Sequence, residues 1–209
     1  MRYYSTKGDK GTTSFGHGRQ ASKAGSEVEY VGALDEAQAA LGFAAVEARL
    51  QEVKWSVAAA ETKSANTNNK QLALDFRVRS ALLRDICTCL KNIQRTVFES
   101  GLIVMDTASE ELIQNWSWVT QTTKIENLCE DFAPQQTLKG FVLPGGSELA
   151  ARIELARVAL RRLERAFCQF STEGASDVDT LAFYNRLSSL AFILARRSNE
   201  ILEVSETTL

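Results

Sequence analysis

The sequence predicts an all-α protein, an up-and-down bundle of about five helices. Three observations favour this class: apolar residues make up 44% of the 209 positions, only two prolines occur, and several long segments repeat apolar residues at steps of three and four. No convincing set of strand-like segments accompanies them. We expect one domain over residues 1–209, with a loop segment at 1–26 and a helical bundle at 27–204.

The N-terminal half begins with a loop-rich segment and continues with two helices. Residues 1–26 carry five glycines, many hydroxyls and several lysines, which is typical of a loop, with one short extended piece expected at Tyr3–Tyr4. Apolar periodicity predicts a helix from about Glu27 to Arg49 and a long helix from about Leu72 to Asp106. The polar run Glu61–Lys70 between them is interpreted as a surface loop.

The C-terminal half contains three further helical segments and one rigid turn. A helix is expected near Trp118–Phe132. The run Phe141–Gly146 ends in Pro-Gly-Gly, which favours a fixed turn. Ser147 is placed to cap the helix that follows, expected from Glu148 to about Phe170 because its apolar residues repeat regularly. A last helix is expected from about Val178 to Val204.

Charge and composition argue against several classes of function. The formal net charge is −2 and the pI is about 5.6, so nothing favours nucleic acid or a membrane surface as the main partner. The N-terminus is polar and does not resemble a signal peptide. No apolar run approaches the roughly 18–20 residues that span a bilayer. We therefore expect a cytoplasmic protein.

Residues that commonly bind transition metals are few. The four cysteines, Cys87, Cys89, Cys129 and Cys168, include only one close pair, and no second pair stands at metal-ligand spacing. We interpret them as free thiols in a reducing cytosol. His17 is the only histidine, which excludes a site built from several histidines.

The first group of candidate site residues is the segment Ser5–Ser14, with the sequence STKGDKGTTS. Glycines allow backbone N–H groups to approach phosphate oxygens, lysines supply positive charge, and hydroxyls can bind Mg²⁺. The spacing is not that of a P-loop. Taken alone, the segment is equally compatible with a plain flexible N-terminus.

The second group lies on two predicted helices. At about 100° per residue, Arg157, Arg161 and Glu164 fall within about 60° of one another, next to the apolar seam. Arginines there would favour carboxylate or phosphate partners, although a solvated charged face explains the pattern too. Asn185 adjoins an apolar stripe, as does Asp35. A buried amide and a surface acid are the alternatives for these two residues.

These residues belong to segments that resemble the PduO-type family of ATP:cob(I)alamin adenosyltransferases. The segments agree with the family in order and spacing along nearly the whole chain, and together they are far more specific than any one alone. They are Gly8–Ser14, Val31–Glu36, Phe141–Gly146, Ala156–Arg165 and Asn185–Ser188. The resemblance implies a ferritin-like, cobalamin adenosyltransferase-like bundle that assembles as a homotrimer, with each active site between two subunits.

The resemblance also implies roles for individual residues. Arg161, Glu164 and Arg165 would be catalytic, Phe141 would line the corrinoid side, and Asp35 with Arg157 would form a salt bridge between subunits. The implied ATP contacts are Ser5, Thr6, Lys7, Gly8, Thr13, Ser14, Lys23, Arg161, Arg162, Glu164, Arg165 and Asn185. ATP would be the co-substrate and cobalamin the substrate. Mg²⁺ would be held mainly by ATP rather than by side chains.

The implied reaction is attack of cobalt(I) on the 5′ carbon of ATP, with triphosphate as the leaving group. The protein would act by positioning and by charge stabilisation. Arg161, Arg165, the lysines and Mg²⁺ would stabilise charge on the triphosphate, and Glu164 would orient an arginine or bind through the metal. Phe141 and nearby apolar groups would keep water and the lower corrinoid ligand away from cobalt. A cobalamin reductase and an acceptor enzyme are further partners that this chemistry leaves open.

The chain departs from the family pattern at four places. Ser5-Thr6-Lys7 stands where Thr-Lys-Thr is usual, Glu154 where His is frequent, Leu163 for Ala, and Ser189 for Asp. These changes leave the expected ATP half nearly intact and affect the expected corrinoid half more. They leave room for a non-catalytic protein of the same fold that binds or carries nucleotide or corrinoid, and for a purely structural helical bundle.

Overall fold

The computed structural model describes residues 4, 6–15, 18–64, 69–138, 140–171 and 178–209. Three expectations fall outside the described residues. They are the ATP contact expected at Ser5, the position of the single histidine His17, and the part of the predicted polar loop at residues 65–68. Tyr3 lies outside them too, and Tyr4 belongs to no strand.

Six helices and one two-stranded hairpin make up the described part of the chain. The helices are α1 (Ser26–Ser64), α2 (Lys70–Val104), α3 (Glu110–Asn115), α4 (Trp118–Asp131), α5 (Glu148–Ser171) and α6 (Val178–Ile201). The largely helical class is confirmed. The expected number of about five helices is too low, because α3 was not anticipated. This short helix begins where the Ser109 hydroxyl accepts a hydrogen bond from the Leu112 N–H at 3.2 Å.

The predicted end of the first helix near Arg49 is wrong, since α1 continues to Ser64. The polar run that was interpreted as a loop from Glu61 is helical over its first four residues. Packing explains the extension: beyond Arg49, Trp55 lies against Phe76 of α2 with ring centroids 5.1 Å apart, and Ala59 is buried. Tertiary contacts therefore override the weak helix signal of the sequence.

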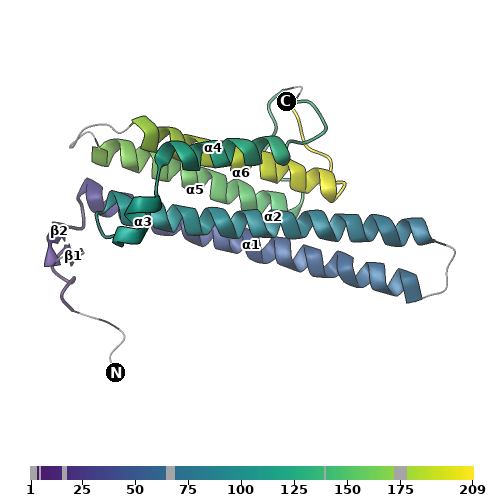
Figure 1. The fold of residues 1–209 in the computed structure, drawn as a ribbon, viewed down its shortest axis with the longest axis horizontal. Helices are drawn as coiled ribbons and strands as arrows, with labels where there is room; N and C mark the ends of the chain where they lie inside the picture. Colours follow the sequence, from purple (N-terminus) through teal and green to yellow (C-terminus); the bar gives the residue numbers. More distant parts are fainter. Residues whose placement is uncertain (1–3, 5, 16–17, 65–68, 139, 172–177) are drawn as a thin grey trace.

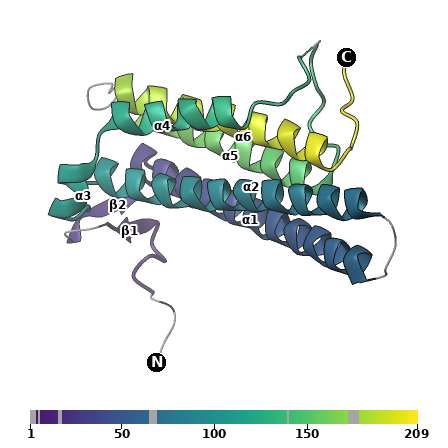
Figure 2. The ribbon, with the colours of Figure 1, turned by 45° about the vertical axis from the view of Figure 1, so that its right-hand side comes forward.

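The glycine-rich segment forms a β-hairpin rather than an unstructured loop. Strands β1 (Thr12–Ser14) and β2 (Gln20–Ser22) pair antiparallel, with Thr12 opposite Ser22 and Ser14 opposite Gln20. The expected extended piece was placed too early in the chain. An ion pair between Arg19 and Glu27 links this hairpin to the start of α1, and Figures 1 and 2 show it lying beside that end of the bundle.

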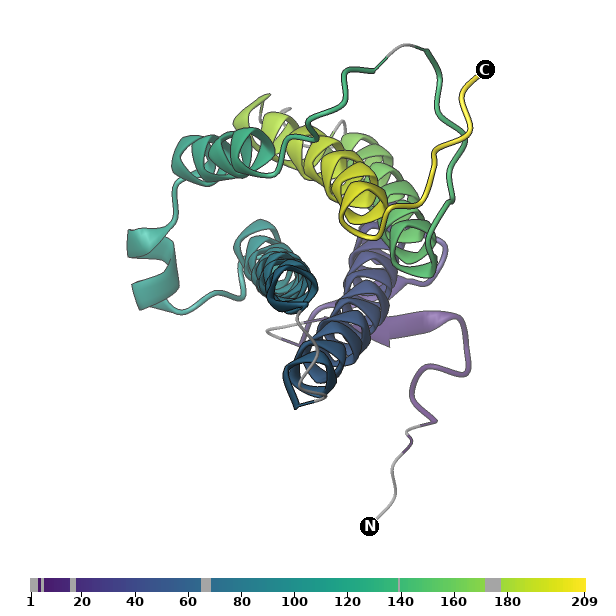
Figure 3. The ribbon, with the colours of Figure 1, turned by 90° about the vertical axis from the view of Figure 1, so that its right-hand side faces the viewer.

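The helices form an up-and-down bundle seen end-on in Figure 3. The two long helices α1 and α2 pack antiparallel, α5 packs on α1 and α6, and α4 covers α6. Figure 1 shows α1 and α2 extending well past the ends of the other helices. None of the described helices is long and apolar enough to cross a membrane.

A cluster of aromatic side chains and hydroxyls fills the core near the hairpin. The hydroxyls of Tyr30 and Tyr184 lie 2.6 Å apart, and Ser100 lies 3.1 Å from Tyr184. Burial raises the pKa of Tyr184 to about 12. Burial, with the neighbouring Tyr184, also raises the pKa of Tyr30 well above its usual value. Both tyrosines therefore stay neutral, and their mutual hydrogen bonds satisfy polar groups that would otherwise be costly to bury.

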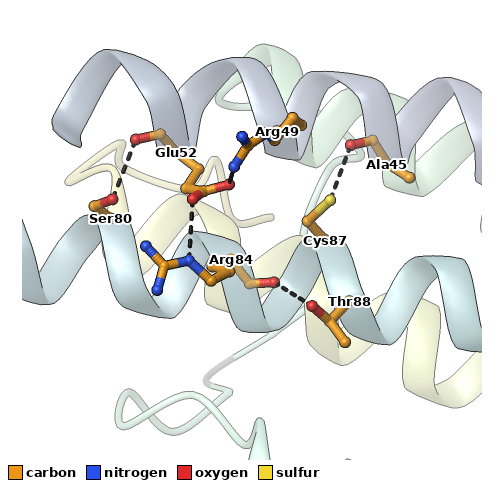
Figure 4. Close-up of polar contacts among 7 residues, drawn as sticks. All are labelled: Ala45, Arg49, Glu52, Ser80, Arg84, Cys87 and Thr88. Carbon is orange, nitrogen blue, oxygen red and sulfur yellow. Dashed lines mark hydrogen bonds and ion pairs between the residues drawn. The ribbon is translucent and has the colours of Figure 1, made fainter. Parts of the chain in front are cut away.

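Polar contacts join α1 and α2 where these helices run together (Figure 4). The buried carboxylate of Glu52 accepts hydrogen bonds from Arg49 and from Arg84, the latter at 3.0 Å. The hydrogen bond from Arg49 lowers the pKa of Glu52. The Cys87 thiol donates to the Ala45 carbonyl at 3.4 Å. All four cysteines are free thiols, as the sequence indicates.

Candidate functional site

The hairpin brings the side chain of Lys23 close to Gly8 of the N-terminal segment. A Cβ atom added to Gly8 would lie 3.2 Å from the Lys23 ammonium nitrogen, so the absence of a side chain at Gly8 leaves room for Lys23. Lys23 is held in register by its backbone N–H, which donates to the Gly11 carbonyl at 2.8 Å. Gly11 has a φ of +79°, a conformation that favours glycine.

The hydroxyls of the expected ATP site lie along β1 and just before it. Thr13 and Ser14 belong to β1. Thr6 and Lys7 are exposed, and the Thr6 carbonyl accepts a hydrogen bond from the Asp9 N–H at 3.2 Å. The segment therefore presents an exposed lysine, a second lysine against glycine, and hydroxyl donors on one hairpin, a combination suited to an anion.

Two arginines of α5 lie on its exposed side. Arg161 and Arg165 are exposed, and Arg165 donates to the Arg161 carbonyl at 3.2 Å. Within the described part of the chain, the Arg161 guanidinium makes no hydrogen bond or ion pair. Its five donors and fixed positive charge are thus available to a phosphate or carboxylate.

The neighbouring Arg162 is already engaged with α1. Its guanidinium forms ion pairs of 3.0 Å with both Glu29 and Glu36, and the hydrogen bond that it donates to Glu29 raises the pKa of Arg162. All three side chains are about half exposed, so each pair contributes little stability. The expected ATP contact at Arg162 is therefore occupied by carboxylates of the same chain.

A chain of hydrogen bonds crosses from α5 to α6 and on to α4. The Asn185 amide donates to the Glu164 carboxylate at 3.1 Å, Arg186 donates to the Asn185 side-chain oxygen at 3.0 Å, and Arg186 also pairs with Glu126 at 2.9 Å. The structure thus brings Glu164 and Asn185 together, as expected for one site. The sequence carries no signal for Glu126, because its contact depends on how α4 packs.

Asp35 and Arg157 do not meet within one chain. Arg157 instead pairs along α5 with the buried carboxylate of Glu154 at 2.6 Å, so the departure from the family pattern at position 154 supplies a local partner. Asp35 is exposed. It lines a pocket of about 550 Å³ between the hairpin, α1 and the end of α2, together with Ser14, Tyr30, Gln38, Phe98 and Met105.

The Pro-Gly-Gly turn is held by a residue that the sequence did not single out. Asn199 of α6 is buried. Its side-chain oxygen accepts from the Ser147 N–H at 2.8 Å and the Ser147 hydroxyl at 2.9 Å, and its amide donates to the Gly145 carbonyl at 3.0 Å. The predicted cap is confirmed, because the Ser147 hydroxyl accepts from the Ala150 N–H at 3.2 Å. Phe141, before this turn, is 85% exposed.

Two of the departures have clear structural positions. Leu163 is fully buried in the core, so its extra bulk is absorbed by packing between helices. Ser189 is exposed, and its hydroxyl bonds back to the Asn185 carbonyl at 3.3 Å. Position 189, where the family resemblance predicts Asp, therefore adds no charge here.

The bundle and its residues define a class of helical protein that presents a glycine- and lysine-bearing hairpin together with arginines on one helix face. The sequence profile of the cobalamin adenosyltransferase family matches residues 3–198. The chain belongs to this family.

Similarity to individual proteins extends along nearly the whole chain. The chain is 29% identical to the corrinoid adenosyltransferase PduO of Salmonella typhimurium over 99% of its own length and 54% of that protein. It is 30% identical to a corrinoid adenosyltransferase of Mycobacterium bovis, over 95% of this chain and 89% of the relative. The chain thus spans about half the length of the PduO relatives that it matches.

The fold is similar to solved structures of the same family. One is a variant of the PduO-type ATP:corrinoid adenosyltransferase from Lactobacillus reuteri complexed with cobalamin and ATP. It has a TM-score of 0.70 at 23% identity, covering 100% of this chain and 96% of that one. This likeness establishes the fold.

Proposed function

We propose that the chain, acting as one domain over residues 1–209, transfers the 5′-deoxyadenosyl group of ATP to cob(I)alamin and releases triphosphate. The observation that carries the proposal is the family match over residues 3–198. The exposed guanidinium groups of Arg161 and Arg165 beside the bonded pair of Glu164 and Asn185 support it. Related proteins named corrinoid adenosyltransferases cover 99% and 95% of the chain.

The electron balance of the reaction assigns the protein a role in charge stabilisation. The cobalt(I) electron pair forms the new Co–C bond, the bond from the 5′ carbon to its phosphate oxygen breaks, and that oxygen leaves with the bonding pair. Negative charge therefore grows on the triphosphate. Arg161 and Arg165, with Lys7 and Lys23 of the hairpin segment, are the groups of this chain that would stabilise it.

Magnesium would be held mainly by the triphosphate. Mg²⁺ prefers hard oxygen ligands and keeps several waters, and the side-chain oxygens near the expected phosphates fit this preference. They are the hydroxyls of Thr13 and Ser14 on β1 and the carboxylate of Glu164, whose second role is to accept the Asn185 amide. When bound, the ion would supply positive charge to the leaving group.

A second subunit would complete the site, within a homotrimer. The outer side of α1 supports this assembly: Phe43, Val46, Leu50, Val53 and Val57 step by three and four residues and are each 43–57% exposed. The opposite side of α1 is buried in the bundle. A helix that is apolar on two sides is normally covered on both.

Asp35 belongs to this exposed side, because it differs from Val46 by only about 20° around the helix. A neighbouring subunit docked there would bring Asp35 toward an arginine face such as that of α5. Arg157 would then lie between Glu154 of its own subunit and Asp35 of the neighbouring subunit. This arrangement would carry the α5 arginines of one subunit to the hairpin of the next.

The corrinoid would bind on the side of Phe141, whose exposed ring is free to contact a flat apolar ligand. We place the reaction in the cytoplasm. A reductase that supplies cob(I)alamin and an enzyme that accepts the product would be transient partners.

An anaerobic assay tests the function. Reduced cobalamin, ATP and Mg²⁺ are mixed with the protein, the corrinoid spectrum is followed, and triphosphate is quantified against a reaction without ATP. Formation of adenosylcobalamin with an equal amount of triphosphate is expected. No triphosphate under strongly reducing conditions would exclude the transferase.

A non-catalytic carrier of the same fold is the second candidate, because Ser189 adds no carboxylate and its hydroxyl donates to the Asn185 carbonyl of the same helix. It predicts tight corrinoid binding without turnover. A purely structural bundle would bind neither substrate, so ATP would not raise its melting temperature.

A further inference from the structure

The position of Phe141 depends on its backbone rather than on contacts of its ring. Phe141 is 85% exposed, so the protein surface does little to hold the side chain. What determines where the ring stands is the path of the segment Phe141–Ser147 that leads into α5. Two separate groups of contacts hold this segment, one from α6 and one from residues 202–209, which we call the tail.

The first group of contacts comes from α6 and holds the end of the segment. Asn199 binds Gly145 and Ser147 through three hydrogen bonds of 2.8–3.0 Å. The turn approaches Asn199 so closely that a Cβ atom on Gly146 would lie 2.6 Å from its side chain. Because Asn199 is also buried, with only 3% of the residue exposed, this end of the segment has little freedom to move.

The second group of contacts comes from the tail and holds the beginning of the segment. The Leu209 N–H donates to the Phe141 carbonyl, and the Leu143 N–H donates to the Thr207 carbonyl, both at 2.9 Å. Val142 and Thr208 form the bridge between these two bonds. Figure 3 shows the yellow tail running beside the green segment that enters α5.

The tail is itself anchored to α6 by a largely buried ion pair. Arg196 pairs with Glu206 at 3.0 Å, and the two side chains are only 10% and 16% exposed. The same guanidinium donates to the Gln136 carbonyl at 3.2 Å. Arg196 therefore ties the tail and the loop before Phe141 to one helix.

We propose that the tail is a positioning element of the corrinoid site: by pairing with Phe141–Leu143 it sets where the Phe141 ring meets the corrinoid. The inference rests on the proposed function, in which Phe141 contacts the corrinoid. It assigns a role in corrinoid binding to Arg196, Glu206 and Leu209. The residues of α5 and of the hairpin that are proposed to bind ATP have no part in this role. Corrinoid affinity should depend on the tail, and ATP affinity should not.

A pair of proline substitutions separates this role from a general effect on folding. Leu209→Pro removes the N–H that bonds to Phe141. Thr208→Pro is the matched control: Thr208 and Val142 face each other between the two bonds, where backbone N–H groups point away from the partner strand. Both variants place proline in the same extended stretch, and only the first breaks a bond to the segment.

Binding of cob(II)alamin in the presence of ATP, and binding of ATP alone, are measured by titration for the full chain and both variants. For Leu209→Pro we expect corrinoid affinity to fall about five- to tenfold, the weight of one backbone hydrogen bond, with ATP affinity unchanged. Thr208→Pro should match the unmodified protein. In the turnover assay, only the corrinoid KM of Leu209→Pro should rise, and the ATP KM should not.

Equal corrinoid affinities for the two proline variants would overturn the proposal, and so would an equal loss of ATP affinity in Leu209→Pro. If Leu209→Pro does not fold, Glu206→Gln is judged by the same criteria, with an expected loss of about two- to fivefold because the hydrogen bonds that Arg196 donates to this side chain are weakened. An unchanged corrinoid affinity in that variant would then refute it. If the unmodified protein binds corrinoid without turnover, the proposed transferase activity is rejected, but the comparison of corrinoid affinities between the variants still tests the role of the tail. If the unmodified protein binds no corrinoid, both the transferase and the role of the tail are rejected.

Discussion

Gly146 offers the sharpest test of how the turn before α5 is built. Its φ is +95°, and a Cβ atom there would lie 2.6 Å from both the amide nitrogen and the oxygen of Asn199. Gly146→Ala therefore imposes two costs. The backbone must hold an L-residue at positive φ, and the buried Asn199 side chain must move out of its hydrogen bonds.

The magnitude follows from these two contributions. Positive φ in a non-glycine residue costs about 1–2 kcal/mol. Displacing Asn199 leaves the Ser147 and Gly145 backbone groups without their partner, at about 1–3 kcal/mol for a buried unsatisfied group. Together they predict that Gly146→Ala lowers the free energy of unfolding by about 2–5 kcal/mol. Gly145→Ala is the control, because its φ is +141° but no atom lies within 4 Å of its Cβ, so it should carry only the backbone cost.

Urea unfolding followed by circular dichroism, at fixed protein concentration, measures both variants. With an m-value of about 2–3 kcal/mol/M, the loss for Gly146→Ala corresponds to a fall in midpoint of about 0.7–2.5 M. In an Asn199→Ala background the cost of Gly146→Ala should drop to that of Gly145→Ala, since the obstructing side chain is gone. Equal losses for the two glycine variants in the unmodified background would refute this account of the turn.

Three further predictions concern activity, pH and assembly. Arg161→Ala should lower kcat/KM about 30- to 1,000-fold, or about 2–4 kcal/mol of transition-state stabilisation, while the exposed Arg77→Ala on α2 should have no effect; steady-state kinetics that do not separate the two would count against the α5 site. The pKa of Tyr184 is raised from 10.0 to about 12, so as pH rises the unfolded chain loses this proton before the folded chain does. The contribution of Tyr184 to the free energy of unfolding is therefore complete below pH 10 and is lost as pH rises toward about 12. The free energy of unfolding should fall in that window, less steeply in Tyr184→Phe, and identical pH profiles would contradict the assignment. Arg157→Ala should loosen the proposed trimer and reduce activity together, and sedimentation of an active monomeric unmodified protein would contradict the proposed interface.

The sequence alone determined the helical class, the regular α5 and the cap at Ser147. These features depend on local chemistry. Apolar periodicity defines the buried face of a helix, and a hydroxyl just before a helix accepts a hydrogen bond from a backbone N–H of the first helical turn. The match of separated motifs in order along the chain also identified the family. Such signals can be recognised from the sequence because each is formed by residues that are close together along the chain.

Local signals were too weak at both ends of the first helical region. The expected end near Arg49 missed the rest of α1, whose helical state depends on Trp55 meeting Phe76 of another helix. The glycine-rich segment was expected to be a loop, yet it closes into a hairpin whose strands are three residues each. Strands this short carry almost no alternation pattern from which they could be predicted.

Only the tertiary structure decided which side chains are neighbours across helices. It placed Glu164 against Asn185, joined Arg186 to Glu126 of α4, and brought Asn199 to the turn before α5. Asn199 and Gly145 are 54 positions apart in the sequence. Periodicity assigns a residue to a face of its own helix, but the partner across that face depends on how the helices pack, and the packing follows from the whole core at once.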